Sequence, residues 1–245
     1  MPEQNLAEEN IHGQTEAAGM TLRSFVDDYW KPYLCRKQTK PSTLRGYQSV
    51  LDNHILLIMD DMLLTDIKPI NVEELLLAKA KSSYAQRTMR NIVVQLNGIL
   101  HLAEDDDLIG KSPVRDRHKP VVRKIEKPIW TPEQVRMIPE SVPTAFRCLF
   151  ICVAMTGLRL GERLALQWKY VDRQSKTLQV ARSLWKKQLV SPKTATSARY
   201  IPLGDVLIDA LAAHRRNSLF TNPEDFVFRS RNGSPRNKRF GSRTK

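Results

Sequence analysis

Apolar residues recur with a helical period in four stretches of the first hundred residues. The strongest stretch runs from Ala85 to Glu104, where the apolar positions form one broad stripe. Shorter stretches with the same period cover residues 22–33, 44–55 and 71–77. Little strand-like alternation interrupts them. The pattern therefore predicts a compact unit of four helices over residues 20–107.

Local capping signals indicate where these helices begin. Thr21 precedes the first apolar stretch and Ser42 the second, and a hydroxyl group there can accept a hydrogen bond from the first turn. Asn71 followed by Glu74 resembles a capping box at the start of the third helix. Residues 1–19 are acidic and polar without apolar periodicity, which predicts a disordered leader.

A basic segment that contains prolines follows the helical unit, from Lys111 to Lys127. Proline blocks the continuation of a helix, and repulsion between like charges favours an extended, solvated chain. We expect an interdomain linker over residues 108–127.

The pattern becomes mixed over residues 128–245. The segment Thr131–Gln134 has the threonine, proline and glutamine that typically open a helix. Apolar periodicity predicts helices over residues 144–155, from the turn at Arg159 to Trp168, and over residues 205–215, the last capped by Asp205. Residues 177–182 and 198–203 alternate like strands, with a further strand expected within residues 184–190. The fold class is therefore mainly α, with a second, α+β unit that contains a small three-stranded antiparallel sheet.

The charge of the chain adds an expectation about partners. Lysine and arginine give a formal net charge of +13, and the isoelectric point is near 9.8. Such an excess favours polyanions, with nucleic acid first and an anionic membrane surface second. No apolar run approaches the ~20 residues that span a bilayer, and the acidic start does not resemble a signal peptide. The three cysteines suggest no framework of disulfide bridges, which fits a reducing compartment. We therefore expect a cytoplasmic protein.

Arg159 and Glu162 are the main candidates for chemistry. Three residues apart, they lie on one side of a helix, where the guanidinium group suits a phosphate and the carboxylate can orient it. Lys193 lies in a turn between two strand-like runs, and a lysine there could protonate a departing oxygen. Lys186 and Lys187 compete with it for this role.

The segment Thr156–Trp168 resembles the first active-site box of the tyrosine recombinases, the phage integrase family. The order of the predicted elements is similar to that family from Met20 onward, and the segment Arg199–Leu203, Arg-x-Ile-Pro-Leu, also resembles it. The resemblance implies a helical core-binding (SAM-like) domain over residues 20–107 and a catalytic domain over residues 128–245. It also implies site-specific DNA integration and recombination by transesterification, without metal or other cofactor. Arg159 would then clamp the scissile phosphate, Glu162 would support the site, and Lys193 would act as general acid.

The chain departs from the family pattern after the predicted sheet. No His-x-x-Arg box follows, and the only tyrosines after Arg159 are Tyr170 and Tyr200, so no residue matches the nucleophile. We expect a catalytic domain that is truncated at its C-terminus and does not complete strand cleavage alone. A full-length form would assemble as a homo-oligomer on DNA.

Double-stranded DNA is the expected partner, and seven residues are candidates for contacting it. They are basic or hydroxyl-bearing side chains in the first unit, in the linker and in the last strand pattern: Lys40, Thr43, Arg45, Lys119, Arg123, Lys124 and Arg199.

Two other functions remain open from the sequence. The chain could be a non-catalytic DNA-binding remnant or a competitor at recombination sites, which would bind DNA without forming a covalent adduct. It could also be a basic transcription regulator whose first domain alone recognises DNA. Cys148 and Cys152 share a helix face without a nearby histidine, which favours a buried core over a metal site.

Overall fold

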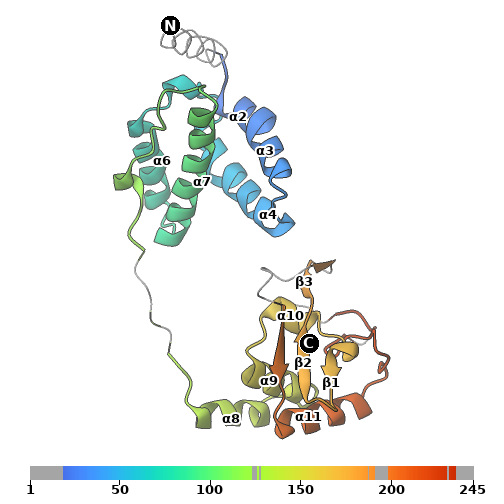
Figure 1. Ribbon diagram of the computed structural model, residues 1–245. Coiled ribbons are helices and arrows are strands. Elements are labelled where there is room, and N and C mark those ends of the chain that lie inside the picture. Colours follow the sequence, from blue (N-terminus) through green and yellow to red (C-terminus); the bar gives the residue numbers. More distant parts are fainter. Residues whose placement is uncertain are drawn as a thin grey trace, which may run out of the picture. The chain divides into compact units, whose positions relative to one another are not determined.

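The computed structural model describes residues 19–122, 126, 128–186, 188–190, 198–230 and 232–235. It divides the chain into two compact units, Met1–Glu126 and Lys127–Lys245 (Figure 1). Each unit has a hydrophobic core of its own. The units are therefore described separately.

Unit 1 contains four helical segments, as predicted. The first comprises α2 (Leu22–Phe25), the π-helical η1 (Val26–Trp30) and α3 (Lys31–Arg36). The second comprises α4 (Pro41–Val50), the π-helical η2 (Leu51–Ile55) and α5 (Leu56–Met59). A 3₁₀ turn, η3 (Leu64–Asp66), leads to α6 (Pro69–Lys81) and α7 (Gln86–Asp105).

The capping predictions had mixed outcomes. Thr21 caps α2, because its hydroxyl oxygen accepts a hydrogen bond from the backbone N–H of Ser24. The prediction that Ser42 caps the second helix is wrong. Pro41 occupies the first helical position, where its fixed φ suits a helix, so Ser42 lies inside the first turn. The prediction that Asn71 and Glu74 open the third helix is also wrong, because α6 begins at Pro69 with Lys68 as its N-cap residue. Asn71 is instead the third helical residue, and its side chain accepts a hydrogen bond from the backbone N–H of Lys68 at 2.9 Å.

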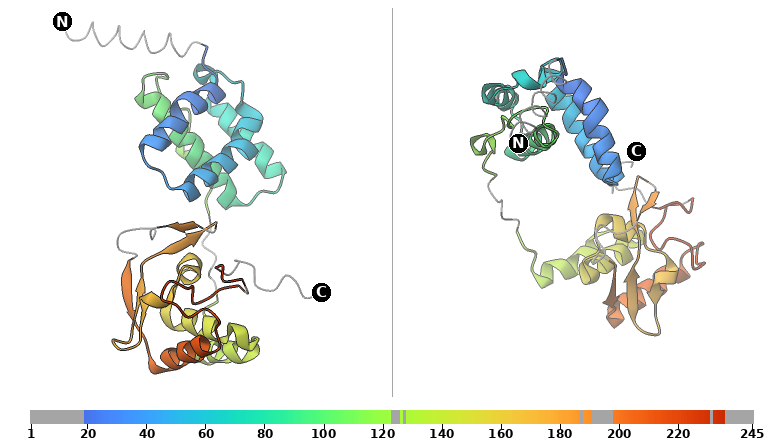
Figure 2. Two further views of the ribbon diagram at one scale, coloured as in Figure 1. Left: turned by 90° about the vertical axis from the view of Figure 1, so that its right-hand side faces the viewer. Right: turned by 45° about the horizontal axis from the view of Figure 1, so that its top comes forward.

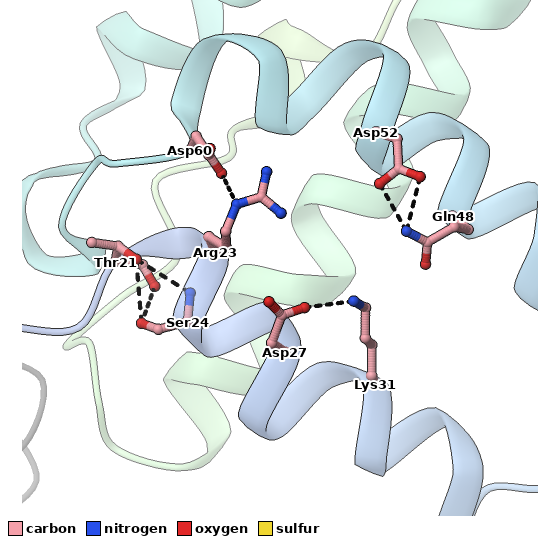
Figure 3. A network of polar contacts seen from close by, with 8 residues as sticks. All are labelled: Thr21, Arg23, Ser24, Asp27, Lys31, Gln48, Asp52 and Asp60. Atoms are coloured by element: carbon pink, nitrogen blue, oxygen red, sulfur yellow. Dashed lines mark hydrogen bonds and ion pairs between the residues drawn. The ribbon is translucent and has the colours of Figure 1, made fainter.

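The first two helical segments of unit 1 form an antiparallel pair that apolar and polar contacts join. Phe25 and Ile55 are fully buried in the shared core. On the outer side, Arg23 donates to Asp60 across the pair at 2.5 Å (Figure 3). The apolar stripe of α7 packs into the same core, with Leu96 and Ile99 fully buried. Burial of the apolar stripes thus holds the four segments together.

The expected linker is not solvated over its first half. Leu108, Ile109 and Val114 are buried in the core of unit 1. A 3₁₀ turn, η4 (Asp116–His118), buries His118, whose Nε2 lies 3.4 Å from Glu73 of α6. Apolar side chains among the prolines therefore fold this stretch onto unit 1, and the charge pattern did not indicate it.

Unit 2 begins with α8 (Pro132–Ser141), where Thr131 and Gln134 form the predicted capping box. It continues with α9 (Thr144–Thr156), α10 (Leu160–Leu164) and a 3₁₀ turn, η5 (Trp168–Tyr170). After the strands comes α11 (Asp205–Arg216), for which Gly204, and not Asp205, is the N-cap residue. Helices α9 and α11 pack together on one side of the sheet (Figure 2). Their buried side chains form the core of unit 2 with Leu178 and Val180.

The sheet of unit 2 is three-stranded and antiparallel, in the order β1 (Val171–Asp172), β2 (Thr177–Val180) and β5 (Arg199–Pro202). Residues 184–190 do not form one strand. Within this stretch, β3 (Ser183–Trp185) pairs with β4 (Gln188–Val190) in a separate hairpin. The chain reverses at Lys186, whose φ of 47° is left-handed, so this stretch pairs with itself.

The helix after Arg159 is shorter than predicted: it ends at Leu164 and does not reach Trp168. Tertiary pairing explains the early end. Val227 donates its backbone N–H to the carbonyl of Leu166, and the N–H of Trp168 donates to Asp225. These bonds replace the helical ones over residues 166–169.

Candidate phosphate-binding site

The turn between α9 and α10 brings Arg159 to the surface. Helix α9 ends at Gly157, whose φ of +62° is left-handed and favours glycine. Arg159 follows in an extended conformation as the N-cap residue of α10. Its side chain is 62% exposed, whereas Glu162 and Leu164 of α10 are buried.

Glu162 is the buried centre of the site. Its side chain is only 4% exposed, and its Oε1 accepts a hydrogen bond from Arg159 Nη1 at 2.8 Å. Its Oε2 accepts from the backbone N–H of Arg159 at 3.0 Å. The Glu162 carboxylate therefore caps α10 through the backbone N–H of Arg159, and it also binds the guanidinium group of Arg159. The structure thus brings together the arginine and glutamate that the sequence singled out.

Arg199 joins this pair from β5. Its Nη2 donates to Glu162 Oε2 at 3.2 Å, and its Nη1 lies 3.4 Å from Oε1. The side chain of Arg199 is 32% exposed. The residue that we expected only to contact DNA therefore belongs to the same cluster as Arg159.

The electrostatics of the cluster keep Glu162 ionised. Burial raises the pKa of its carboxyl group, but the hydrogen bonds from Arg199 and from Arg159 outweigh burial, so the pKa is lowered overall. A carboxylate that stays charged holds two guanidinium groups near each other. One negative charge faces two positive charges, and the cluster as a whole is cationic.

The cluster has the properties of an oxyanion-binding site. Guanidinium groups stay protonated and match the geometry of phosphate oxygens. A buried carboxylate fixes their positions before any ligand arrives, which lowers the cost of binding. A preoriented arginine pair, with Arg159 exposed and Arg199 partly exposed, is suited to hold the phosphate of a nucleic acid backbone.

The third predicted catalytic residue, Lys193, lies outside the described residues, as does its competitor Lys187. The other competitor, Lys186, is exposed at the turn of the β3–β4 hairpin. Its Nζ lies 5.3 Å from the centre of the Trp185 ring.

The predicted DNA-contacting residues of unit 1 cluster at the start of α4. Lys40 is the N-cap residue, and Thr43 and Arg45 follow in the first turns. All three are exposed. Their exposure is compatible with phosphate contacts but does not test them.

The predicted DNA-contacting residues of the linker are described only in part. Lys119 is exposed and pairs with Asp116 at 2.6 Å, which offsets part of its charge. Arg123 and Lys124 lie outside the described residues.

Neither tyrosine that follows Arg159 shares the site. Tyr200 is adjacent to Arg199 on β5, and successive strand residues point to opposite faces of a sheet. Its exposed side chain therefore points away from the face on which Arg199 meets Glu162. Tyr170 packs against the core of unit 2.

The two neighbouring cysteines belong to the core. Burial raises the pKa of Cys148 to about 12 and that of Cys152 to about 11, so both stay protonated thiols. No group of histidine, cysteine or acidic side chains suited to a metal ion occurs among the residues that the structure describes. Over the same residues, no helix is long and apolar enough to cross a membrane.

Sequence reasoning missed the link between Arg199 and Glu162. The two residues are 37 positions apart, and only the register of β5 on β2, with Arg199 opposite Val180, places them together. The segment Arg199–Leu203 carried a family resemblance, which could have pointed to Arg199 but gave no contact.

Comparison with known proteins agrees with this architecture. Residues 21–78 match the family model of the phage integrase N-terminal SAM-like domain, and residues 130–244 match that of the phage integrase family. The chain therefore belongs to the phage integrase family of tyrosine recombinases.

Relatives of known name share limited identity with it. The ICEBs1 integrase of Bacillus subtilis (strain 168) is 26% identical over 188 residues, which cover 72% of this chain and 50% of the relative. A putative prophage phiRv2 integrase of Mycobacterium tuberculosis (strain CDC 1551 / Oshkosh) is 26% identical over 227 residues, 90% of this chain and 58% of the relative. The chain thus spans about half the length of these relatives.

Solved structures show the same fold. The Tn1549 transposon integrase, in complex with a circular intermediate DNA, has a TM-score of 0.74 at 20% identity, over 89% of this chain and 73% of that one. A lambda integrase dimer bound to a COC' core site has a TM-score of 0.69 at 20% identity, over 89% of this chain and 59% of that one. At these identities the likeness concerns the fold.

Proposed function

We propose that this chain binds duplex DNA and holds a backbone phosphate with Arg159 and Arg199, as part of site-specific DNA recombination by transesterification. The observation that carries the proposal is the buried carboxylate of Glu162, which holds both guanidinium groups. The net charge of +13 supports a polyanionic partner.

Each residue of the cluster has a distinct role in this proposal. Arg159, the more exposed arginine, binds the phosphate oxygens, and Arg199 adds a second cation from the sheet. Glu162 positions both. In a transesterification such cations would stabilise the charge that grows on the phosphate oxygens. Lys193 remains our candidate for the general acid.

The remaining parts of the proposal concern the partners and the domains. Residues 20–107 form the core-binding domain, with Lys40, Thr43 and Arg45 as phosphate contacts. Residues 108–127 connect it to the catalytic domain, and Lys119, Arg123 and Lys124 add contacts from there. The protein works as a homo-oligomer on DNA in the cytoplasm.

The test is the DNA affinity of the chain as a function of salt, measured with a short fluorescent duplex. Arg159→Ala should weaken binding and lower the slope of log affinity against log salt by about one, because one phosphate contact is lost. Arg136→Ala removes the same charge from an exposed position on α8 and is the control. Equal effects of the two substitutions would refute the site.

A second candidate function is DNA binding without cleavage. It is favoured by the positions of Tyr170 in the core and of Tyr200 on the face opposite Arg199. A nicked duplex that traps covalent intermediates separates the two functions. These 245 residues should bind it without forming a denaturant-resistant adduct. An adduct that disappears in Tyr200→Phe would contradict our placement of that tyrosine.

A further inference from the structure

Helix α10 and strand β3 approach each other at Gly161 more closely than a side chain allows. A Cβ atom added to Gly161 would lie 2.3 Å from Ser183 Oγ and 3.1 Å from the carbonyl oxygen of Leu184. Non-bonded carbon atoms usually stay about 3.5–4.0 Å from their neighbours. Glycine is therefore the residue that fits this contact.

Apolar packing reinforces the same contact at the other end of α10. Leu184 of β3 is buried together with Leu164 and Ala165, apart from the main core of unit 2. The helix thus meets β3 near its first turn through Gly161 and at its end through Leu164. Both contacts involve Leu184, so they fix the distance between β3 and α10 at this residue.

The position of Gly161 connects this packing to the site. Gly161 lies between Arg159 and Glu162 on the one turn of helix that carries both. On the other side of the contact, the turn of the β3–β4 hairpin presents the exposed cation Lys186, and Arg182, the residue before β3, is also exposed. A shift of β3 would therefore change the position of these cations relative to Arg159.

We propose that Gly161 is a positioning residue that holds the β3–β4 hairpin against α10, so that Lys186 and Arg159 contact the same stretch of DNA backbone. This inference rests on the proposed function, because it requires that Arg159 bind a DNA phosphate. It assigns to Gly161 a role in DNA binding that needs no contact with DNA.

The test combines hydrogen exchange with DNA affinity. In Gly161→Ala, the amides of Trp185 and Gln188, the pair next to the two-residue turn of the hairpin, should exchange about tenfold faster. Amides of α9 and α11 should keep their protection, which shows that the unit is folded. Lys186→Ala should weaken DNA binding in the native background and have no further effect in Gly161→Ala.

Two further variants make the test specific. Ser183→Ala, added to Gly161→Ala, removes the oxygen at 2.3 Å and leaves the Leu184 carbonyl oxygen at 3.1 Å, so it should restore part of the hairpin protection and part of the effect of Lys186→Ala. Gly204→Ala is the matched control, since its Cβ would meet only the flexible end of Met155 at 3.2 Å. It should behave like the native chain.

Three results would overturn the inference, and they distinguish its failure from that of the proposed function. Native hairpin exchange in Gly161→Ala, or an equal effect of Lys186→Ala in both backgrounds, contradicts the positioning role. Native DNA affinity in Arg159→Ala refutes the proposed function, and with it the shared DNA contact, even where the hairpin responds to Gly161→Ala.

Discussion

Glu162 combines two tasks that usually fall to different residues. It caps α10 through the backbone N–H of Arg159, and it binds the side chains of Arg159 and Arg199. A carboxylate buried in this way is stabilised only while its cationic partners remain in place. The stability of the fold near α10 and the geometry of the arginine pair therefore depend on the same group.

Glu162→Gln should lower the free energy of unfolding of unit 2 by about 1–3 kcal/mol, because two cations lose a charged hydrogen-bond partner. Denaturant unfolding with hydrogen exchange as the local probe measures this. Glu133→Gln, at an exposed carboxylate on α8, is the control and should change stability by less than about 0.5 kcal/mol. Equal losses in both variants would contradict the assigned role.

The lowered pKa of Glu162 also predicts a pH dependence. The unfolded chain takes up a proton at this group near the ordinary glutamate pKa, and the folded chain only at lower pH. The stabilisation is therefore fully present above the ordinary pKa and is lost as pH falls through the lowered one. The stability difference between the native chain and Glu162→Gln should shrink below about pH 4.5. A constant difference between neutral and acidic pH would contradict this.

The local part of the site could be predicted from the sequence, and the non-local part could not. Arg159 and Glu162 are three residues apart, so helix geometry alone places them together. Arg199 meets Glu162 only through strand register, and Gly161 meets Ser183 only through tertiary packing. Spacing along the chain carries no information about either contact.

At the scale of elements, predictions succeeded where local chemistry decides the structure. The apolar stripe of α7 and the Thr131–Gln134 capping box gave helices at the expected places. The predictions failed where contacts between segments distant in the sequence determine the local structure. Residues 223–227 pair with the end of the predicted Arg159 helix and shorten it. Leu108 and Val114 fold the start of the expected linker onto unit 1.

Thr131→Ala should destabilise α8 by about 1 kcal/mol, because the N–H of Gln134 loses its acceptor at the helix start. Thr131→Ser keeps the hydroxyl group and should retain most of that stability. Hydrogen exchange of the first α8 amides reports the effect locally. A serine variant as unstable as the alanine variant would show that the methyl group, and not the cap, matters here.

At the scale of the whole molecule, two separate cores predict two separate responses to mutation. Phe25 is fully buried in the core of unit 1, and unit 2 has a core of its own. Phe25→Ala should cost unit 1 about 3–5 kcal/mol through the cavity it leaves. Hydrogen exchange should rise in α4 and α7 and stay native in α9 and α11. A uniform rise in both units would indicate one cooperative unit instead.

The most direct test of the central claim is a double-mutant cycle of DNA affinity on Arg159 and Arg199. If both arginines hold one phosphate, each alanine substitution should weaken binding roughly tenfold, and the double variant should bind little worse than either single one. Arg136→Ala should leave affinity nearly native. Additive losses would mean that the two arginines bind separate phosphates. No loss in either single variant would show that the cluster around Glu162 is structural only.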